Sequence, residues 1–261
     1  MQTGLECIGD IDLYSMSEVL MLAAGSLETI SENYILDLSH MGFMSGLLDC
    51  GIDQREQDRI LKLVGMKNLS EIAVLCEELM IPERIREAIC KMTTMYLPLE
   101  ESIGEMKAYV TNRRMAEALQ ELCEILEVMK LYGVDRKIYV DFSMVNDMRY
   151  YNGIIFQGFI EGIPDGVLSG GRYDNLLQKI GKKAGAIGFA VYLDRLERFG
   201  DDRREYDVDT LLLYDADTPV CEVVSTAQKL RKEGKTVKAA RADLRTVKYR
   251  QVIDLGKGGR N

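Results

Sequence analysis

The chain begins with a short segment, residues 2–8, whose polar side chains could hold a small ligand. If this segment is a β-strand, Gln2, Gly4 and Glu6 share one face, because alternate residues of a strand point to the same side. A carboxylate and an amide then project over a glycine that leaves room between them. Such a pair suits a ligand with an ammonium or imidazole group, since a carboxylate accepts hydrogen bonds from cations and an amide donates or accepts them. A solvent-exposed strand face is the alternative, and this segment alone favours it.

A pair of tyrosines in the stretch NDMRYYNG, residues 146–153, is the second candidate. Adjacent residues of a strand face opposite sides, so both tyrosines cannot line the same pocket. Continuing the register puts Tyr151 and Gln157 on one face and Tyr150 and Phe156 on the other. We therefore expect Tyr151 to line a polar cleft and Tyr150 to enter the core. Ordinary aromatic packing between strands is the alternative, and it is favoured on this stretch alone.

Two glycine-containing stretches follow. SGGRYDNLL, residues 169–177, opens with paired glycines that permit a tight turn or a close approach to a ligand, and Asp174 then complements the dipole of a helix. It matches neither the P-loop nor the dinucleotide-binding pattern. GAIGFAVYLDRLERF, residues 185–199, places Arg195 just inside a helix. This arginine could bind an anion or form an ion pair on its own helix with Asp194 or Glu197, and the second reading is favoured.

Composition excludes several classes of function. The formal net charge of −9 argues against non-specific nucleic-acid binding, which requires Lys and Arg to neutralise phosphates. The six cysteines form no C-x-x-C pair, so they are expected to be reduced thiols of a cytoplasmic protein. His40 is the only histidine, which excludes a multi-histidine metal site, and we expect it to be structural. No apolar run approaches the roughly 18 residues that span a bilayer. We expect no metal, no cofactor and no membrane association.

The spacing of apolar residues predicts a sheet-based core that carries a helical insertion. After the first strand a helix is expected, with Ser15 or Ser17 as its cap. From about residue 51 to 131 the pattern is helical and charged, with no strand signal, and Pro82 stands at a helix start. Strand patterns return from residue 137. Strands in series without long helices between them predict an antiparallel sheet with helices packed on one side.

A charged linker, FGDDRREYD, separates the core at 1–200 from a C-terminal domain at 207–261. Strand and helix patterns alternate in this second part, which predicts a small α/β domain. One of its helices is expected over residues 244–252.

The order of four motifs resembles one family. QTGLECIG, YYNGIIFQGF, SGGRYDNLL and GAIGFAVYLDRLERF, in this succession, resemble the catalytic core of histidyl-tRNA synthetases and of their paralogue, the regulatory subunit of ATP phosphoribosyltransferase. The resemblance covers most of residues 1–200, and the tail resembles the family's anticodon-binding domain. It implies an α+β fold: an antiparallel sheet of class II aminoacyl-tRNA synthetase type with a helical insertion at about 51–131, plus the small C-terminal α/β domain. Motif one and the start of motif two are missing, so we expect a core that is incomplete at its N-terminus.

Carried over to this sequence, the family's histidine pocket would use Gln2, Glu6, Tyr151 and Tyr173. The strand register agrees with this assignment. It groups Gln2 with Glu6, and it selects Tyr151 rather than Tyr150.

Two departures from the synthetase pattern bear on catalysis. Synthetases carry Arg-Gly-Leu-Asp before the tyrosine pair, whereas residues 146–149 read Asn-Asp-Met-Arg, and Asn146 cannot supply positive charge to a reacting group. Arg149 lies too close to the tyrosines to match the family's arginine. The glycine of motif three is replaced by Tyr192, although Arg195 is kept. We therefore expect Tyr192 and Arg195 to mark a vestigial ATP site, and we expect no catalytic residues.

The resemblance thus implies a non-catalytic regulatory subunit of ATP phosphoribosyltransferase in histidine biosynthesis, one that binds histidine. Its expected partner is the short-form catalytic subunit, with a homodimer of this chain inside a hetero-oligomer. One alternative is a histidyl-tRNA synthetase that activates histidine with ATP and charges tRNA. Another is a stand-alone histidine-binding module.

Overall fold

The computed structural model divides the chain into two units, Met1–Phe199 and Gly200–Asn261. The residues that the structure describes are 1–144, 151–196, 206–241 and 247–256. In this described part, no helix combines the length and the apolar character needed to cross a membrane. All six cysteines are free thiols.

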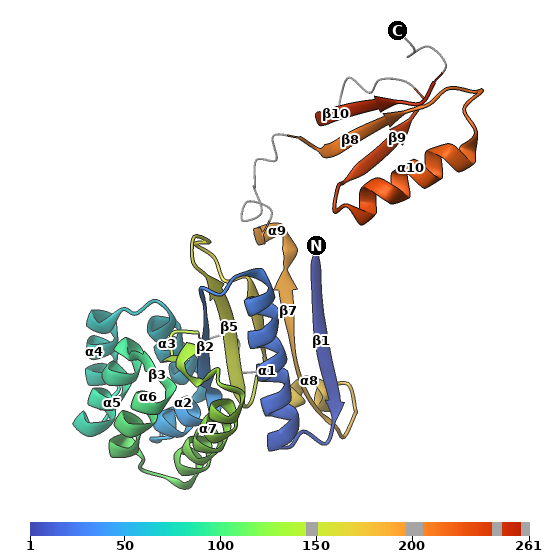
Figure 1. Cartoon of the computed structure of the whole chain (residues 1–261). Coiled ribbons are helices and arrows are strands. Elements are labelled where there is room, and N and C mark those ends of the chain that lie inside the picture. Colours follow the sequence, from blue (N-terminus) through green and yellow to red (C-terminus); the bar gives the residue numbers. More distant parts are fainter. Residues whose placement is uncertain (145–150, 197–205, 242–246, 257–261) are drawn as a thin grey trace. The chain divides into compact units, whose positions relative to one another are not determined.

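A seven-stranded sheet forms the centre of the larger unit (Figure 1). In spatial order its strands are β1 (Gln2–Gly9), β7 (Gly185–Tyr192), β6 (Leu168–Arg172), β5 (Ile154–Ile160), β2 (Tyr34–His40), β4 (Ile138–Asp141) and β3 (Tyr96–Pro98). Every neighbouring pair is antiparallel except β2 and β4, which run parallel. The prediction of an antiparallel sheet from strands in series is confirmed.

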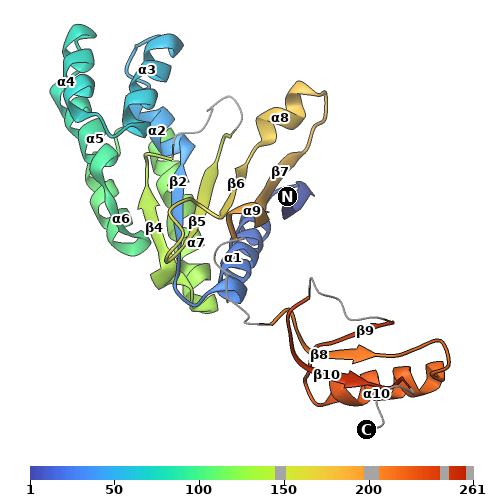
Figure 2. The same ribbon diagram turned by 90° about the horizontal axis from the view of Figure 1, so that it is seen from above.

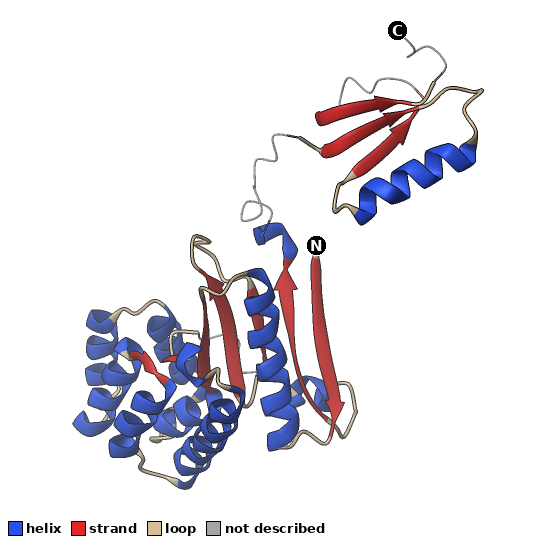
Figure 3. Cartoon of the chain, in the orientation of Figure 1, coloured by secondary structure: helices blue, strands red, loops and turns tan. Residues whose placement is uncertain are grey.

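The two faces of this sheet differ in chemistry. One face is apolar and packs against α1 (Leu13–Ile30) and α7 (Arg113–Tyr132), which run along the same side of the strands (Figure 3). Gly158 of β5 lies so close to α1 that a Cβ there would be 2.6 Å from Leu27 Cδ1. We call the opposite side the polar face. The register places on it Gln2, Glu6, Tyr192, Ser169, Gln157, Asp37 and Asp141.

The helical insertion gathers beside β2 and β4, at the end of the sheet away from β1 (Figure 2). Its helices are α2 (Met41–Leu48), α3 (Gln54–Gly65), α4 (Leu69–Glu78), α5 (Glu83–Thr94) and α6 (Leu99–Met106), with the short 3-10 turn η1 (Lys107–Tyr109), before the long α7. Pro82 occupies the N-cap position of α5 and so stands at a helix start, as predicted. The expectation of no strand in this block is wrong, because β3 pairs with β4. Three residues are too few to show an alternating pattern.

The cap of α1 also differs from the expectation. Neither Ser15 nor Ser17 caps this helix; Asp12 does, accepting a hydrogen bond from Ser15 N at 2.8 Å. Asp and Ser are both strong capping residues, and Asp12, Ser15 and Ser17 lie within six positions of one another. Residue type alone therefore could not decide which of them caps the helix, and the tertiary packing does. Three short elements complete the unit: η2 (Asp135–Lys137), α8 (Asp174–Lys179) and α9 (Leu193–Leu196).

The smaller unit contains a three-stranded parallel sheet in the order β10 (Tyr249–Asp254), β8 (Val208–Leu213), β9 (Val237–Ala240). Helix α10 (Val220–Lys232) packs on it through Val223, Ala227 and Leu230. The helix expected over residues 244–252 is wrong in its second half, because residues 249–252 belong to β10. Pairing with β8 decides their conformation, and local helical spacing cannot reveal that pairing.

Candidate functional site

The centre of the candidate site is the contact between β1 and the start of α8. The hydroxyl of Tyr173 donates a hydrogen bond to Glu6 Oε2. Glu6 pairs with Gly188 of β7, and its carboxylate lies so closely over this glycine that a Cβ at position 188 would collide with Oε2. Glu6 is exposed and Tyr173 is buried, so the carboxylate is open to solvent on one side and held by the phenol on the other.

Gly188 thus forms a floor beneath the Glu6 carboxylate, and a second glycine extends this floor. Gly171 of β6 is the pairing partner of Gly188, and a Cβ there would be 2.8 Å from the ring of Tyr151. Tyr151 also packs against the cluster that contains Tyr173 and Ala186. The structure therefore gathers Glu6, Tyr151 and Tyr173 around two paired glycines, with the glycines providing the space.

Gln2 lies apart from this group. It pairs with Tyr192, and it shares the polar face with Glu6 as expected. Four residues of strand nevertheless separate the two side chains by about 13 Å. Gln2 is exposed at the far end of β1. Of the four residues assigned to the histidine pocket, three thus lie together and Gln2 lies apart from them.

A separate cavity of about 340 Å³ lies on the polar face and is lined by Ser143, Gln157, Ser169, Tyr192 and Arg195, among others. The Tyr192 hydroxyl is 2.7 Å from Ser169 Oγ, and the Arg195 guanidinium lies over the Tyr192 ring, 4.3 Å from its centroid. Arg195 also donates to the carbonyl of Gly166. Asp194, one of the two acids expected to pair with Arg195, instead pairs with the amino group of Met1 at 3.7 Å. Glu197, the other, lies outside the described residues, so that part of the reading stays a prediction.

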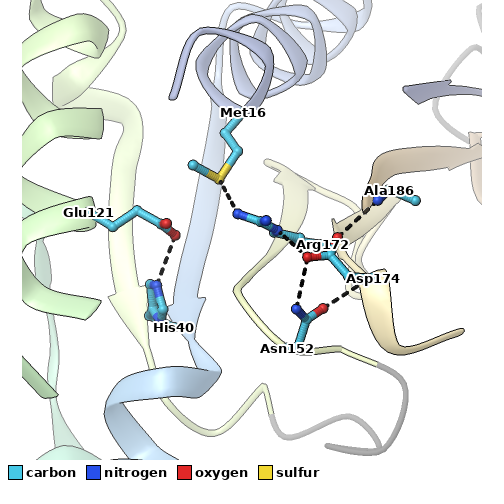
Figure 4. A network of polar contacts seen from close by, with 7 residues as sticks. All are labelled: Met16, His40, Glu121, Asn152, Arg172, Asp174 and Ala186. Atoms are coloured by element: carbon cyan, nitrogen blue, oxygen red, sulfur yellow. Dashed lines mark hydrogen bonds and ion pairs between the residues drawn. The ribbon is translucent and has the colours of Figure 1, made fainter. Parts of the chain in front are cut away.

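A network of polar contacts supports the tyrosine cluster from the apolar side of the sheet (Figure 4). Asn152 Nδ2 donates to Asp174 Oδ2 at 3.1 Å, and the backbone N–H of Asp174 donates to Asn152 Oδ1 at 2.9 Å. Arg172 Nε donates to Asp174 Oδ2 at 2.8 Å, and Ala186 N donates to Asp174 Oδ1 at 2.9 Å. The sequence assigned Asp174 to a helix dipole; in the structure its carboxylate accepts three hydrogen bonds.

Comparison with known proteins matches a family model described as histidyl-tRNA synthetase to residues 1–196. The chain belongs to the histidyl-tRNA synthetase family. Its sheet and insertion accordingly have the class II synthetase fold that the motif order predicted.

Individual relatives include proteins named for ATP phosphoribosyltransferase. An ATP phosphoribosyltransferase regulatory subunit of Acetivibrio thermocellus is 31% identical over 219 residues, covering 82% of this chain and 52% of the relative. A solved structure from Bacillus halodurans, described as an ATP phosphoribosyltransferase regulatory subunit/histidyl-tRNA synthetase, has a TM-score of 0.78 and 26% identity, covering 98% of this chain and 68% of the other. A chain of the ATP phosphoribosyl transferase (HisG:HisZ) complex from Thermotoga maritima shares the fold at a TM-score of 0.57 and 21% identity, over 74% of this chain and 65% of the other. The chain thus spans about half the length of the first of these relatives.

Some residues that bear on the comparison with synthetases lie outside the described residues. These are Asn146, Asp147, Met148, Arg149 and Tyr150. The expectations that Tyr150 enters the core and that Asn146 replaces an activating arginine therefore stay predictions.

His40, the only histidine of this family member, is buried and structural in its contacts. Its Nδ1 accepts a hydrogen bond from Gly42 N at 3.0 Å and so caps α2. The proton of the neutral ring therefore sits on Nε2, which lies 2.9 Å from Glu121 Oε1 on α7. Burial acts to raise the pKa of Glu121, but the hydrogen bond and electrostatic attraction from His40, together with the charge of Arg172, outweigh it and hold that pKa below its ordinary value.

Sequence reasoning missed one cluster on the polar face. Asp37 is buried on β2 and accepts a hydrogen bond from the Tyr96 hydroxyl of β3 at 3.1 Å. Asp141 of β4 pairs with Lys67 Nζ at 3.1 Å. Burial raises the pKa of Asp37 from 3.8 to about 6, while the bond from Tyr96 acts in the opposite direction. The alternation of β2 could have identified Asp37 as an inward-facing acid, but its partners are distant in sequence.

Proposed function

We propose that this chain is part of a regulatory subunit of ATP phosphoribosyltransferase that binds histidine and does no chemistry of its own. The observation that carries the proposal is the Glu6 carboxylate held by Tyr173 over the Gly188–Gly171 floor, with the ring of Tyr151 beside it. The names of the relatives support the same reading, since the 31% identical protein is such a subunit.

The chemistry of the cluster fits histidine. An exposed carboxylate can accept hydrogen bonds from an ammonium or imidazole N–H, and the charge of histidine's amino group favours such a partner. Tyrosine rings attract cations through their electron-rich faces and pack against a flat imidazole. We therefore assign histidine to Glu6, Tyr151 and Tyr173, and give Gln2 a role at the outer end of the site.

The cavity around Tyr192 supports the absence of activation chemistry. In a nucleotide site that has lost its function, we expect the cationic side chain to be bonded within the protein and the cavity for the nucleotide to be reduced. Here the Arg195 guanidinium is stacked on Tyr192 and bonded to the Gly166 carbonyl, and the Tyr192 hydroxyl bonds to Ser169. Both Tyr192 and Arg195 thus make contacts within the protein at the position that the resemblance assigns to ATP.

The partner in this proposal is the short-form catalytic subunit, bound in the cytoplasm by a homodimer of the regulatory subunit within a hetero-oligomer. Relatives named regulatory subunits support this, as does the shared fold with a chain of the HisG:HisZ complex. Co-purification with a short ATP phosphoribosyltransferase is the direct measurement. Histidine binding without such co-purification would instead indicate a stand-alone histidine-binding module.

Calorimetric titration of the full chain with L-histidine tests the site. We expect binding by the unsubstituted chain, and loss of the heat signal and of the histidine-induced thermal shift for Glu6→Ala and Glu6→Gln. Glu78→Gln, at an exposed carboxylate of α4, is the matched control and should bind like the parent. Unchanged binding by both Glu6 variants would show that the pocket lies elsewhere.

Family membership also supports the synthetase alternative, in which the chain activates histidine and charges tRNA. Histidine-dependent exchange of pyrophosphate into ATP separates the two functions. We expect none. Exchange that requires histidine would contradict the regulatory assignment.

A further inference from the structure

Each of the two tyrosines of the proposed site is followed in the sequence by a polar residue, and these two polar residues hydrogen-bond to each other. Asn152 follows Tyr151, and Asp174 follows Tyr173. The Asn152 side chain makes two hydrogen bonds to Asp174: its Nδ2 donates to the carboxylate at 3.1 Å, and its Oδ1 accepts from the backbone N–H at 2.9 Å. One side chain thus fixes the distance between the backbone segments that carry the two tyrosines (Figure 4).

Both sides of this connection are anchored to the sheet. Asp174 is 9% exposed, and its carboxylate also accepts from Arg172 Nε and Ala186 N. The backbone N–H of Asn152 donates to the Arg172 carbonyl at 3.1 Å. The carbonyl of Gly153 accepts from Met41 N, at the start of α2, at 2.9 Å. Because the surroundings are fixed, a change in the Asn152–Asp174 bonds must be absorbed by the tyrosine-bearing segments.

The direction of the side chains separates this pair from the ligand. Arg172 pairs with Ile187 in the strand register and so points to the apolar side, where it also lies 3.7 Å from the sulfur of Met16. Tyr173 bonds to Glu6 on the polar face. The network therefore lies behind the sheet, while the proposed ligand site lies in front of it, and the backbone at residues 151–153 and 172–174 connects the two.

We propose that Asn152 is a positioning residue of the histidine site: by bridging to Asp174 it holds Tyr151 and Tyr173 at the spacing over Glu6 that the ligand requires. This inference rests on the proposed function and deepens it. Asn152 does not touch the ligand, and it acts through two neighbours. Asparagine is suited to this role because one amide supplies the donor for the carboxylate and the acceptor for the N–H at the same time.

The test is a charge-swap cycle read out by calorimetric titration of the full chain with L-histidine. Asn152→Asp keeps the acceptor but turns the donor into a carboxylate oxygen that faces Asp174. We expect this variant to bind histidine at least about tenfold more weakly than the parent, since hydrogen bonds to buried charged groups are strong and tenfold is a modest part of their strength. Asp174→Asn should also weaken binding, because it places two amides together and removes the partner of Arg172.

The double variant Asn152→Asp/Asp174→Asn restores a donor opposite a carboxylate and should bind histidine better than either single variant, because coupled neighbours are non-additive in such a cycle. It should stay weaker than the parent, because Arg172 still lacks the Asp174 carboxylate. Each titration is made at a temperature at which near-ultraviolet circular dichroism shows the variant folded. A purely structural role would lower the melting temperature without this pattern in affinity. The matched control is Asn33→Asp, which creates the same repulsion at the surface pair of Asn33 and Glu161 and should leave histidine affinity unchanged.

The outcomes separate this inference from the proposed function. If the parent binds histidine and Glu6→Gln does not, the proposed function stands. Parent-like affinity of Asn152→Asp, or a double variant that binds no better than the single ones, would then overturn the positioning role alone. A parent chain that binds no histidine would overturn both.

Discussion

The Glu6 carboxylate of β1 lies directly over the Cα of Gly188, its pairing partner on β7, and no side chain other than hydrogen fits beneath it. We therefore predict an effect on binding when a single methyl group is added at position 188. Gly188→Ala should displace Glu6 from Tyr173 and weaken histidine binding at least about tenfold, as expected when a charged hydrogen bond in a site is lost. Titration with histidine measures the change. Affinity equal to that of the parent would show that the floor of the site is not needed.

A glycine elsewhere gives the opposite expectation. Gly104 of α6 is exposed, and a Cβ there would meet no atom within 4 Å. Gly104→Ala should therefore raise the free energy of unfolding by about 1 kcal/mol, because alanine restricts the unfolded chain and favours the helix. Urea denaturation measures the gain, and histidine affinity should stay constant. A loss of stability would mean that this turn of α6 needs the freedom of glycine.

The acid cluster on the polar face predicts a dependence of stability on pH. The folded chain keeps the Asp37 proton up to about pH 6, whereas an unfolded chain loses it near the ordinary pKa of 3.8. The folded state therefore binds more protons between these values, and the free energy of unfolding falls as pH rises through that window. Asp37→Asn should remove this fall and be more stable than the parent at pH 8 by about 3 kcal/mol, with no gain at pH 4.

Chemical denaturation at a series of pH values measures this difference. Tyr96→Phe provides the companion variant, since loss of the hydroxyl removes the interaction that lowers the pKa of Asp37. Its stability should fall more steeply with pH than that of the parent. Parallel pH curves for parent and Asp37→Asn would contradict the assignment.

His40 both caps α2 and donates a hydrogen bond to Glu121, and substitutions can separate these two roles. His40→Ala removes both the cap of α2 and the donor to Glu121, and should cost about 2–3 kcal/mol of stability. His40→Asn keeps a capping side chain and should cost about 1 kcal/mol less. Because the pKa of Glu121 is held below its ordinary value, the stability from this pair is present above that ordinary value and is lost as pH falls through the lowered one. Equal losses for the two variants at neutral pH would show that capping contributes nothing.

The alternation of the strands could be predicted, and with it the choice of face for most site residues. The period of two grouped Gln2 with Glu6 and, on another strand, Tyr151 with Gln157. The register of β1 confirms the first grouping. The same period could not show that Gln2 lies too far along β1 to join the cluster, although the rise per residue contains that information.

What the sequence could not supply is pairing across long separations. Asp174 looked like a helix-dipole residue because its local position explains it fully, while its partner Asn152 lies 22 residues earlier. Asp37 and Tyr96 are 59 residues apart, and Tyr96 belongs to a strand of three residues inside a helical block. Such contacts follow from the order of strands in the sheet, and no local pattern determines that order.

The pairing of β1 with β7 also has a consequence for the time at which the chain folds. Gln2 pairs with Tyr192, so β1 must wait for a strand that the ribosome makes much later. The helical block between them depends on local contacts and can fold while synthesis continues, whereas closing so long a loop delays the sheet edge. We therefore expect nascent chains to acquire the insertion first and β1 last. Glu6 would then reach its place over Gly188 only after β7 has emerged, so histidine binding would mark chains in which β7 has already been made and paired.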